Sequence, residues 1–132
     1  MGAQNNENNP HSFVAYLGTV SDAGDYPVCH LPKRFKISKV VLLDQNGIAA
    51  SDTNYVQLSL KKKQVGESAV EVAECDTRAA HEGAATANQA YPLNLDADES
   101  NVDRDSDLYV TYAEGGSGTL TGAQLQVHGY WI

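Results

Sequence analysis

The chain has 132 residues, of which 42% are hydrophobic and 20% are charged. A single domain of this length can build a sufficient core without metals or disulfides, and the composition excludes a disordered chain. The longest apolar stretches, such as residues 40–43, are far shorter than a membrane span. A membrane is therefore not expected among its partners.

The charge is acidic overall and unevenly divided along the chain. The sequence has 17 acidic and 9 basic residues, which gives a formal net charge of -8. Residues 1–63 carry 7 basic and 5 acidic side chains, whereas residues 64–132 carry 2 basic and 12 acidic ones. We expect no nucleic-acid partner, because a polyanion would approach against this field. Two copies of the chain could still pack head to tail.

The N-terminal segment, residues 1–11, is polar and rich in asparagine, and it ends near Pro10. Because it has no periodic apolar pattern, it predicts a flexible arm, followed by a single β-sandwich domain over residues 12–132. The segment also lacks the basic start and apolar stretch of a secretory signal. We therefore expect the chain to be made in the cytoplasm.

Beyond the arm, short runs of apolar and β-favouring residues are separated by turn residues. Residues 55–61 show the clearest period of two, with Val56, Leu58 and Leu60 on one face. This spacing predicts an all-β fold, an antiparallel β-sandwich of about eight strands. The predicted strands are residues 13–18, 26–31, 35–43, 55–61, 69–76, 90–95, 108–113 and 119–131.

Three strands carry more specific predictions. Pro27 and Pro32 mark the second strand as an edge or irregular strand, because proline cannot donate to a sheet. The continuous apolar run at residues 40–43 predicts that the third strand is central. In the last strand, a bulge at Gly122 would bring Leu120 into phase with the later apolar residues.

The sequence contains no pattern that predicts a catalytic or cofactor site. Motifs for a phosphate-binding loop or a nucleophile elbow are missing. Cys29 and Cys75 are better interpreted as buried free thiols than as a disulfide. We expect no enzymatic activity, no cofactor and no catalytic residues. The four histidines stand alone, without the paired spacing of a metal site, and are His11, His30, His81 and His128.

The most distinctive polar segment is the acidic stretch 96–107. Oxygen-bearing side chains recur there at every second residue, as in loops that wrap a hard cation. Asp96, Asp98, Asp103 and Asp105 are therefore weak candidates for calcium ligands. A solvated loop between strands is the simpler interpretation, because carboxylates in contact with water need no ion. No metal is assigned.

Two basic clusters stand out against the acidic background. In one interpretation they are solvated strand ends that guard against aggregation. In the other they form a docking patch for an acidic partner or for the acidic half of another copy. The sequence favours neither. The clusters consist of Lys33, Arg34, Lys36 and Lys39, and of Lys61, Lys62 and Lys63.

Two stretches carry a resemblance to a known family. The first runs from residues 35–44 to residues 54–60, and the second is the closing hairpin 108–122 with its Gly-Ser-Gly-Thr loop, followed by 124–131. With the short polar arm and the order of the strands, they resemble the small β-sandwich decoration, or cement, proteins that coat the capsids of tailed bacteriophages. The resemblance covers most of residues 12–132.

The resemblance implies a jelly-roll-like homo-oligomer, a trimer in preference to a dimer, on the outer capsid surface of a virion. Its partner would be the major capsid protein, and it transfers no catalytic residues. We expect the arm to become ordered on the capsid or on a neighbouring subunit, beginning with the residues nearest the domain. The candidate partner-binding residues are Pro10, His11, Ser12 and Phe13, together with the two basic clusters.

A carbohydrate-binding module or a fibre-like adhesin is the alternative function. In that case exposed members of the seven tyrosines, with Trp131, would contact sugar, and the acidic stretch would hold calcium. Most of the tyrosines occupy alternating strand positions, where packing in the core or between subunits is the commoner role.

Overall fold

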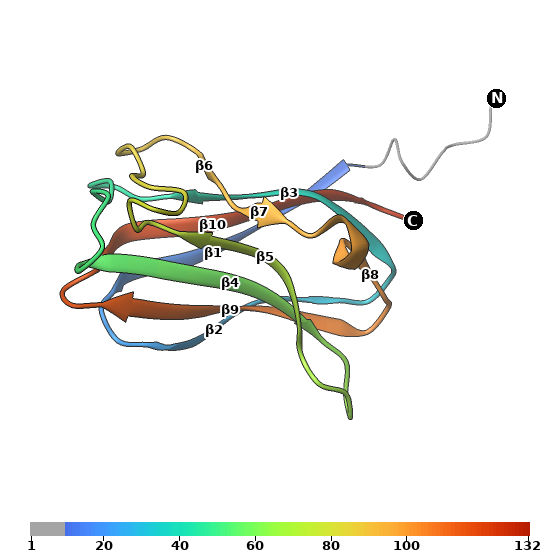
Figure 1. Ribbon diagram of the computed structural model, residues 1–132. Helices are drawn as coiled ribbons and strands as arrows, with labels where there is room; N and C mark the ends of the chain where they lie inside the picture. Colours follow the sequence, from blue (N-terminus) through green and yellow to red (C-terminus); the bar gives the residue numbers. More distant parts are fainter. Residues whose placement is uncertain (1–9) are drawn as a thin grey trace.

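Two antiparallel β-sheets pack face to face in the computed structural model, which describes residues 10–132 (Figure 1). In spatial order, sheet A consists of β1 (Pro10–Val20), β10 (Leu120–Trp131), β3 (Phe35–Leu43) and β6 (Tyr91–Pro92), with β8 (Asn101–Val102) also paired to β3. Sheet B consists of β2 (Gly24–Leu31), β9 (Ser106–Gly115), β4 (Tyr55–Lys63), β5 (Val70–Asp76) and β7 (Asn94–Leu95). A short 3-10 helix, η2 (Ala97–Glu99), lies between β7 and β8.

The order of the strands is that of a jelly roll. The short strands β6 and β8 both pair with β3 and together take the place of one strand, so sheet A has the order β1-β10-β3-β6/β8. Sheet B has the order β2-β9-β4-β5, with the short β7 added at its edge. Two interlocked Greek keys of this kind define the jelly roll. The predicted fold class, an all-β antiparallel β-sandwich, is therefore confirmed.

The core lies between the two sheets and follows the alternation seen in the sequence. In β4, Val56, Leu58 and Leu60 point inward and are at most 1% exposed. Leu125 and Val127 of β10 face them from sheet A and are fully buried. β3 lies between β10 and the short strands β6 and β8, so its predicted central position is confirmed.

The strands lie where the sequence predicted them, but some of their first and last residues differ from the prediction. β1 begins at Pro10, two residues inside the expected arm, because Pro10 and His11 pair with the end of β10. Residues 1–9 of that arm lie outside the described residues. The single strand expected at 90–95 is divided into β6 and β7, which pair with different sheets.

Two predicted irregularities are present. β2 is an edge strand of sheet B, with a register shift between Pro27 and Cys29, as the prolines indicated. In β10, Gly122 has a φ of +51° and lies where the pairing with β1 shifts. Leu120 and Ala123 are both buried in the core as a result, so the predicted bulge is confirmed.

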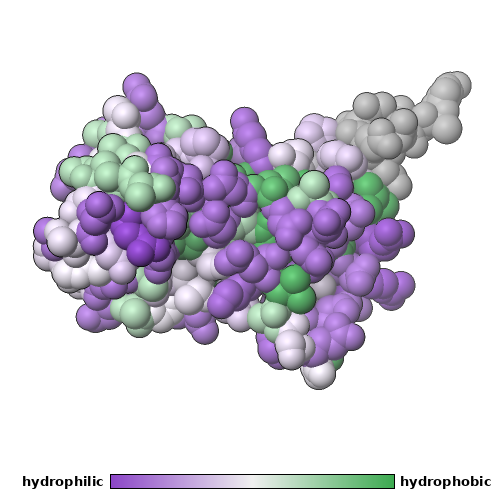
Figure 2. Space-filling model, viewed as in Figure 1, coloured by the Kyte–Doolittle hydropathy of each residue, from purple (hydrophilic) through white to green (hydrophobic). Residues whose placement is uncertain are grey.

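The loop between β5 and β6 folds as turns and is held by a backbone bridge between Ile48 and Ala85. Figure 2 shows weakly hydrophobic residues gathered over this loop, where several alanines are exposed. Within residues 10–132, no helix is long and apolar enough to cross a membrane.

Candidate interaction surfaces

An aromatic cluster holds the base of the predicted arm. The ring of Phe13 meets those of Phe35 and Trp131 edge-on, at centroid distances of 5.4 and 6.0 Å. The ring of His11 lies 4.5 Å from that of Phe13 and 5.5 Å from that of Trp131. Phe13 therefore packs against the core, whereas the other three candidate residues at the arm base are exposed.

Two of the predicted docking lysines are occupied within the chain. The Nζ atom of Lys62, in β4, donates to the backbone oxygens of Glu99 and Asn101 and pairs with the Glu99 carboxylate, at 3.0 Å in each case. The Nζ atom of Lys36, in β3, donates to Ser100 Oγ at 2.7 Å. Because β3 and β4 belong to different sheets, these lysines fix one segment across the end of the sandwich. We call these five residues the end clamp.

The other basic residues point in different directions. Lys33 and Arg34 meet Arg104 around a cleft of about 450 Å³. Lys39 lies on the outer face of sheet A, paired with β10. The structure thus does not bring the two basic clusters into one docking patch. The lysines on the outer face of sheet B are Lys61 and Lys63.

The structure separates the candidate calcium ligands of the acidic stretch. Asp96 accepts a hydrogen bond from the backbone nitrogen of Asp98 at 3.0 Å and caps η2. Asp105 lies 3.7 Å from His30 Nε2 and 3.7 Å from Arg104 Nε. In the part of the chain that the structure describes, no three His, Cys, Asp or Glu side chains are grouped to hold a metal ion. This geometry gives the calcium hypothesis no support.

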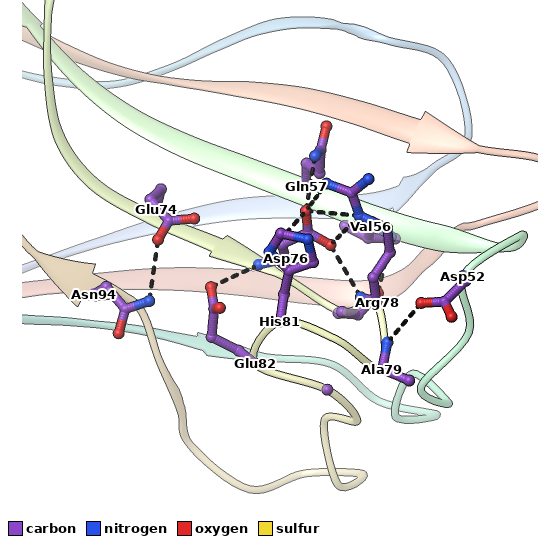
Figure 3. Close-up of polar contacts among 12 residues, drawn as sticks. Asp52, Val56, Gln57, Glu74, Asp76, Arg78, Ala79, His81, Glu82 and Asn94 are labelled. Atoms are coloured by element: carbon purple, nitrogen blue, oxygen red, sulfur yellow. Dashed lines mark hydrogen bonds and ion pairs between the residues drawn. The ribbon is translucent and has the colours of Figure 1, made fainter.

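The densest polar cluster surrounds Asp76 at the end of β5 (Figure 3). Its carboxylate accepts Arg78 Nη2 at 2.6 Å, Gln57 Nε2 at 2.8 Å and the Arg78 backbone nitrogen at 2.9 Å. Burial alone would raise the pKa of Asp76, but the hydrogen bonds from Arg78 and Gln57 outweigh it and hold the pKa well below its usual value. The cluster is a structural ion pair that ties the following loop to β4.

The outer face of sheet B contains an open groove of about 580 Å³ across β9, β4 and β5. Its lining includes the small side chains of Ser59 and Thr111 and the carboxylates of Glu71 and Glu74. Ser59 donates a hydrogen bond to Glu71, and Asn94 donates one to Glu74 at 3.0 Å. The groove can therefore offer hydroxyl and carboxylate groups to a polar ligand.

Three of the tyrosines offer no stacking surface beside this groove. Tyr91 and Tyr112 are buried in the core. The ring of Tyr55 packs against Gly115 on one side, and the guanidinium of Arg78 lies 4.7 Å from its centroid. A sugar ring has no free aromatic face to stack on at that position.

The outer face of sheet A is nearly free of charged side chains. Hydrogen bonds of 2.8 to 3.0 Å join Ser12, His128, Gln126 and Gln124 in a chain along β10. Lys36 and Lys39 supply the charge on this face in residues 10–132, and Lys36 is held in the end clamp. We call the outward side chains of β1 and β10 the low-charge face; they are Ser12, Val14, Tyr16, Gln124, Gln126, His128 and Tyr130.

Both cysteines are free, as the sequence indicated. Burial, with a smaller effect of the Asp107 charge, raises the pKa of the Cys29 thiol to about 11. Burial likewise raises the pKa of Cys75 to about 12. Neither forms appreciable thiolate at neutral pH, so both are poor nucleophiles.

The strand order of its two sheets places this protein in the jelly-roll class of β-sandwiches. No protein-family model matches the chain, and no curated protein matches it. A chain in the solved structure of infectious bursal disease virus, Gx strain, is similar with a TM-score of 0.33 and 12% identity. The similarity covers 93% of this chain and 37% of that chain, so this chain spans little more than a third of its length.

Two features of the site were not predicted from the sequence. For the Asp76 cluster, the one local signal is an acidic and a basic residue two positions apart, Asp76 and Arg78, just past a strand. The low-charge face has a stronger signal. Residues 10–20 contain no Asp, Glu, Lys or Arg, in a chain in which 20% of the residues are charged.

Proposed function

We propose that this protein binds the outer surface of a bacteriophage capsid and stabilises it as a decoration, or cement, protein. The low-charge face is the observation that best supports the proposal. Interface cores are depleted in charged residues and enriched in aromatic ones, and this face presents Tyr16 and Tyr130. The outer face of sheet B carries Asp25, Lys61 and Glu71, and would face solvent.

Binding of this kind needs packing and hydrogen bonding, without chemistry. The amides of Gln124 and Gln126 bond to each other in the free protein and can exchange that bond for backbone groups of the major capsid protein. A protein that binds the assembled capsid but not its separate subunits stabilises the assembled capsid by mass action. Several copies joined in a homo-oligomer bind more tightly than one. The proposed role uses no cofactor and no catalytic residue.

Co-sedimentation with purified tailed-phage capsids that lack this chain tests the proposal. The test variant is the double substitution Gln124→Glu with Gln126→Glu, and the matched control is Gln89→Glu on the exposed β5–β6 loop. We expect the double variant to bind about tenfold more weakly or worse, because buried unpaired carboxylates are costly. The control should bind like the wild type. Equal binding of all three proteins, or no binding of the wild type, would contradict the proposal.

The arm provides a second contact in this proposal. Deletion of residues 1–9 should lower the capsid affinity, because an extended polar segment can pair with a groove or strand on the partner. Deletion of residues 1–11 should also lower the melting temperature of the isolated protein, because it removes His11 from the aromatic cluster. If the shorter deletion leaves the affinity unchanged, residues 1–9 have no part in binding.

Carbohydrate binding remains a second candidate because of the groove on sheet B. Its hydroxyl and carboxylate groups are of the kind that bind sugar hydroxyls, although the covered ring of Tyr55 removes one stacking surface. A glycan array with the wild type and with Glu74→Gln would test this function. Specific binding that the substitution abolishes, with no capsid binding, would favour it over the capsid role.

A further inference from the structure

The sandwich has four sheet edges, and three of them are protected against pairing with another strand. Beside β3 lie the two-residue strands β6 and β8, and beside β5 lies the two-residue β7. The third edge, β2, carries Asp25, Pro27 and a register shift. Short strands, charges, proline and bulges are the devices by which natural proteins prevent edge pairing.

The fourth edge, β1, has little of this protection. It is eleven residues long, contains no charged residue, and has its one proline at the first position. In the part of the chain that the structure describes, β10 is the one strand that pairs with it, so its other edge has no strand partner. Val14 is 43% exposed and Tyr16 is 80% exposed on this strand. Gly18, with a φ of +71°, begins the irregular end at which the pairing shifts.

We infer that β1 pairs antiparallel with β1 of a second copy across a two-fold axis, joining the two copies of sheet A into one continuous sheet. The charges on the molecule favour this occupant. Two chains of net charge -8 repel each other overall. Residues 10–17 and the low-charge face beside them form a strip where two copies can approach without opposing like charges.

The alternation of side chains restricts the register of this contact. Residues that pair across an antiparallel ladder have side chains on the same side of the sheet. The outward residues of one β1 must therefore pair with the outward residues of the other. Centring the axis on Val14 pairs Val14 with its own copy and Tyr16 with Ser12. This register uses the regular part of β1 and stops at the shift beside Gly18.

The contact goes beyond the proposed function and does not depend on it, because it can be measured without a capsid. An interface of this type is isologous and closes after two copies. The proposed unit is therefore a dimer, in place of the trimer expected from the resemblance.

Sedimentation equilibrium or light scattering gives the first test. The wild type should have twice the 14.2 kDa chain mass at micromolar concentration. Val14→Lys should raise the dimer dissociation constant about tenfold or more, because it places two like charges opposite each other at the axis. Tyr16→Lys should also weaken the dimer, because it replaces an aromatic side chain in the contact with a charged one. Val65→Lys is the matched control, since Val65 is 93% exposed but lies in the turn after β4. It should leave the dimer intact.

Disulfide formation tests the register. In Val14→Cys the two Cα atoms would lie about 4.5–5.5 Å apart, within the roughly 4.4–6.8 Å that a disulfide spans. In Tyr16→Cys they would be four residues apart, or about 14 Å, so this variant should cross-link only when mixed with Ser12→Cys. The native thiols, half-buried Cys29 and buried Cys75, have pKa values raised to about 11 and 12 and should not compete.

Three results would overturn the inference. They are a wild type that stays monomeric or forms a trimer, a dimer that both lysine variants leave intact, and cross-linking of Tyr16→Cys alone without cross-linking of Val14→Cys. Circular dichroism of each variant should match the wild type, because Val14 and Tyr16 point to solvent in the monomer. Failure to bind a capsid would refute the proposed function and leave these measurements unaffected.

Discussion

Replacing Lys62 with methionine tests whether this basic residue acts inside the molecule. The Lys62 ammonium is 3.0 Å from two backbone oxygens and from the Glu99 carboxylate, and its side chain is only 18% exposed. Methionine keeps most of the apolar stem and removes the charge. Its effect on the free energy of unfolding therefore measures what the ammonium contributes to the end clamp.

We expect Lys62→Met to lower the free energy of unfolding by about 2–3 kcal/mol, since each hydrogen bond to a charged group contributes roughly 1.5–3 kcal/mol and the released carbonyls regain water. The Glu99 ion pair adds less than about 1 kcal/mol, because the Glu99 side chain is 37% exposed. For a domain of this size, the melting temperature should fall by roughly 6–15 °C.

Urea unfolding followed by Trp131 fluorescence provides the assay, with two control variants. Lys63 is exposed and its side chain has no hydrogen-bond or ion-pair partner within residues 10–132, so Lys63→Met should change stability by no more than about 0.5 kcal/mol. Glu99→Gln keeps both carbonyl bonds and should cost less than about 1 kcal/mol. A Lys62→Met effect no larger than that of Lys63→Met would refute the internal role of Lys62.

Three further predictions concern the core, pH and calcium. Gly129→Ala would push a methyl group into the Lys36 backbone oxygen and the Phe35 ring and should cost at least about 1–3 kcal/mol; Gly24→Ala, with open space around it, is the control for urea unfolding, and equal effects would contradict the packing argument. The pKa of Asp76 in the folded state lies below its usual 3.8, so its carboxylate stabilises the fold above that value and loses this contribution as the pH falls through the folded-state pKa. As the pH is lowered below about 4, the melting temperature should therefore fall less steeply for Asp76→Asn than for the wild type. Identical slopes of melting temperature against pH would show that Asp76 has no such role. Calcium and a chelator should leave the melting temperature unchanged, whereas a rise of several degrees with calcium would show that the folded state binds it.

Local periodicity explains why the strands could be predicted and their ends could not. The two-residue period of β4 and the glycine of the β10 bulge can each be recognised within a short stretch of sequence. By contrast, the start of β1 at Pro10 depends on Tyr130, which lies far along the chain. The division of residues 90–95 between the two sheets likewise depends on partners in β3 and β5.

The side-chain partners were harder to predict than the fold, although one signal was available. Lys61, Lys62 and Lys63 look equivalent as a charged run. The period of two that places Leu60 inward also places Lys62 on the inward face, where it meets the segment that crosses the end of the sandwich. Which carbonyls it meets could not be predicted, because that segment is distant in sequence and carries no motif.

The position of β10 between β1 and β3 determines when the protein can fold during its synthesis. Both neighbours leave the ribosome long before residues 120–131 do. At roughly 5–20 residues per second, the interval between β1 and its partner is on the order of 5–20 s. Throughout this time the uncharged β1 segment of a nascent chain has no β10 to pair with. Neighbouring nascent chains on one messenger RNA therefore present the same unpaired strand, and slow or crowded translation should favour aggregation through it.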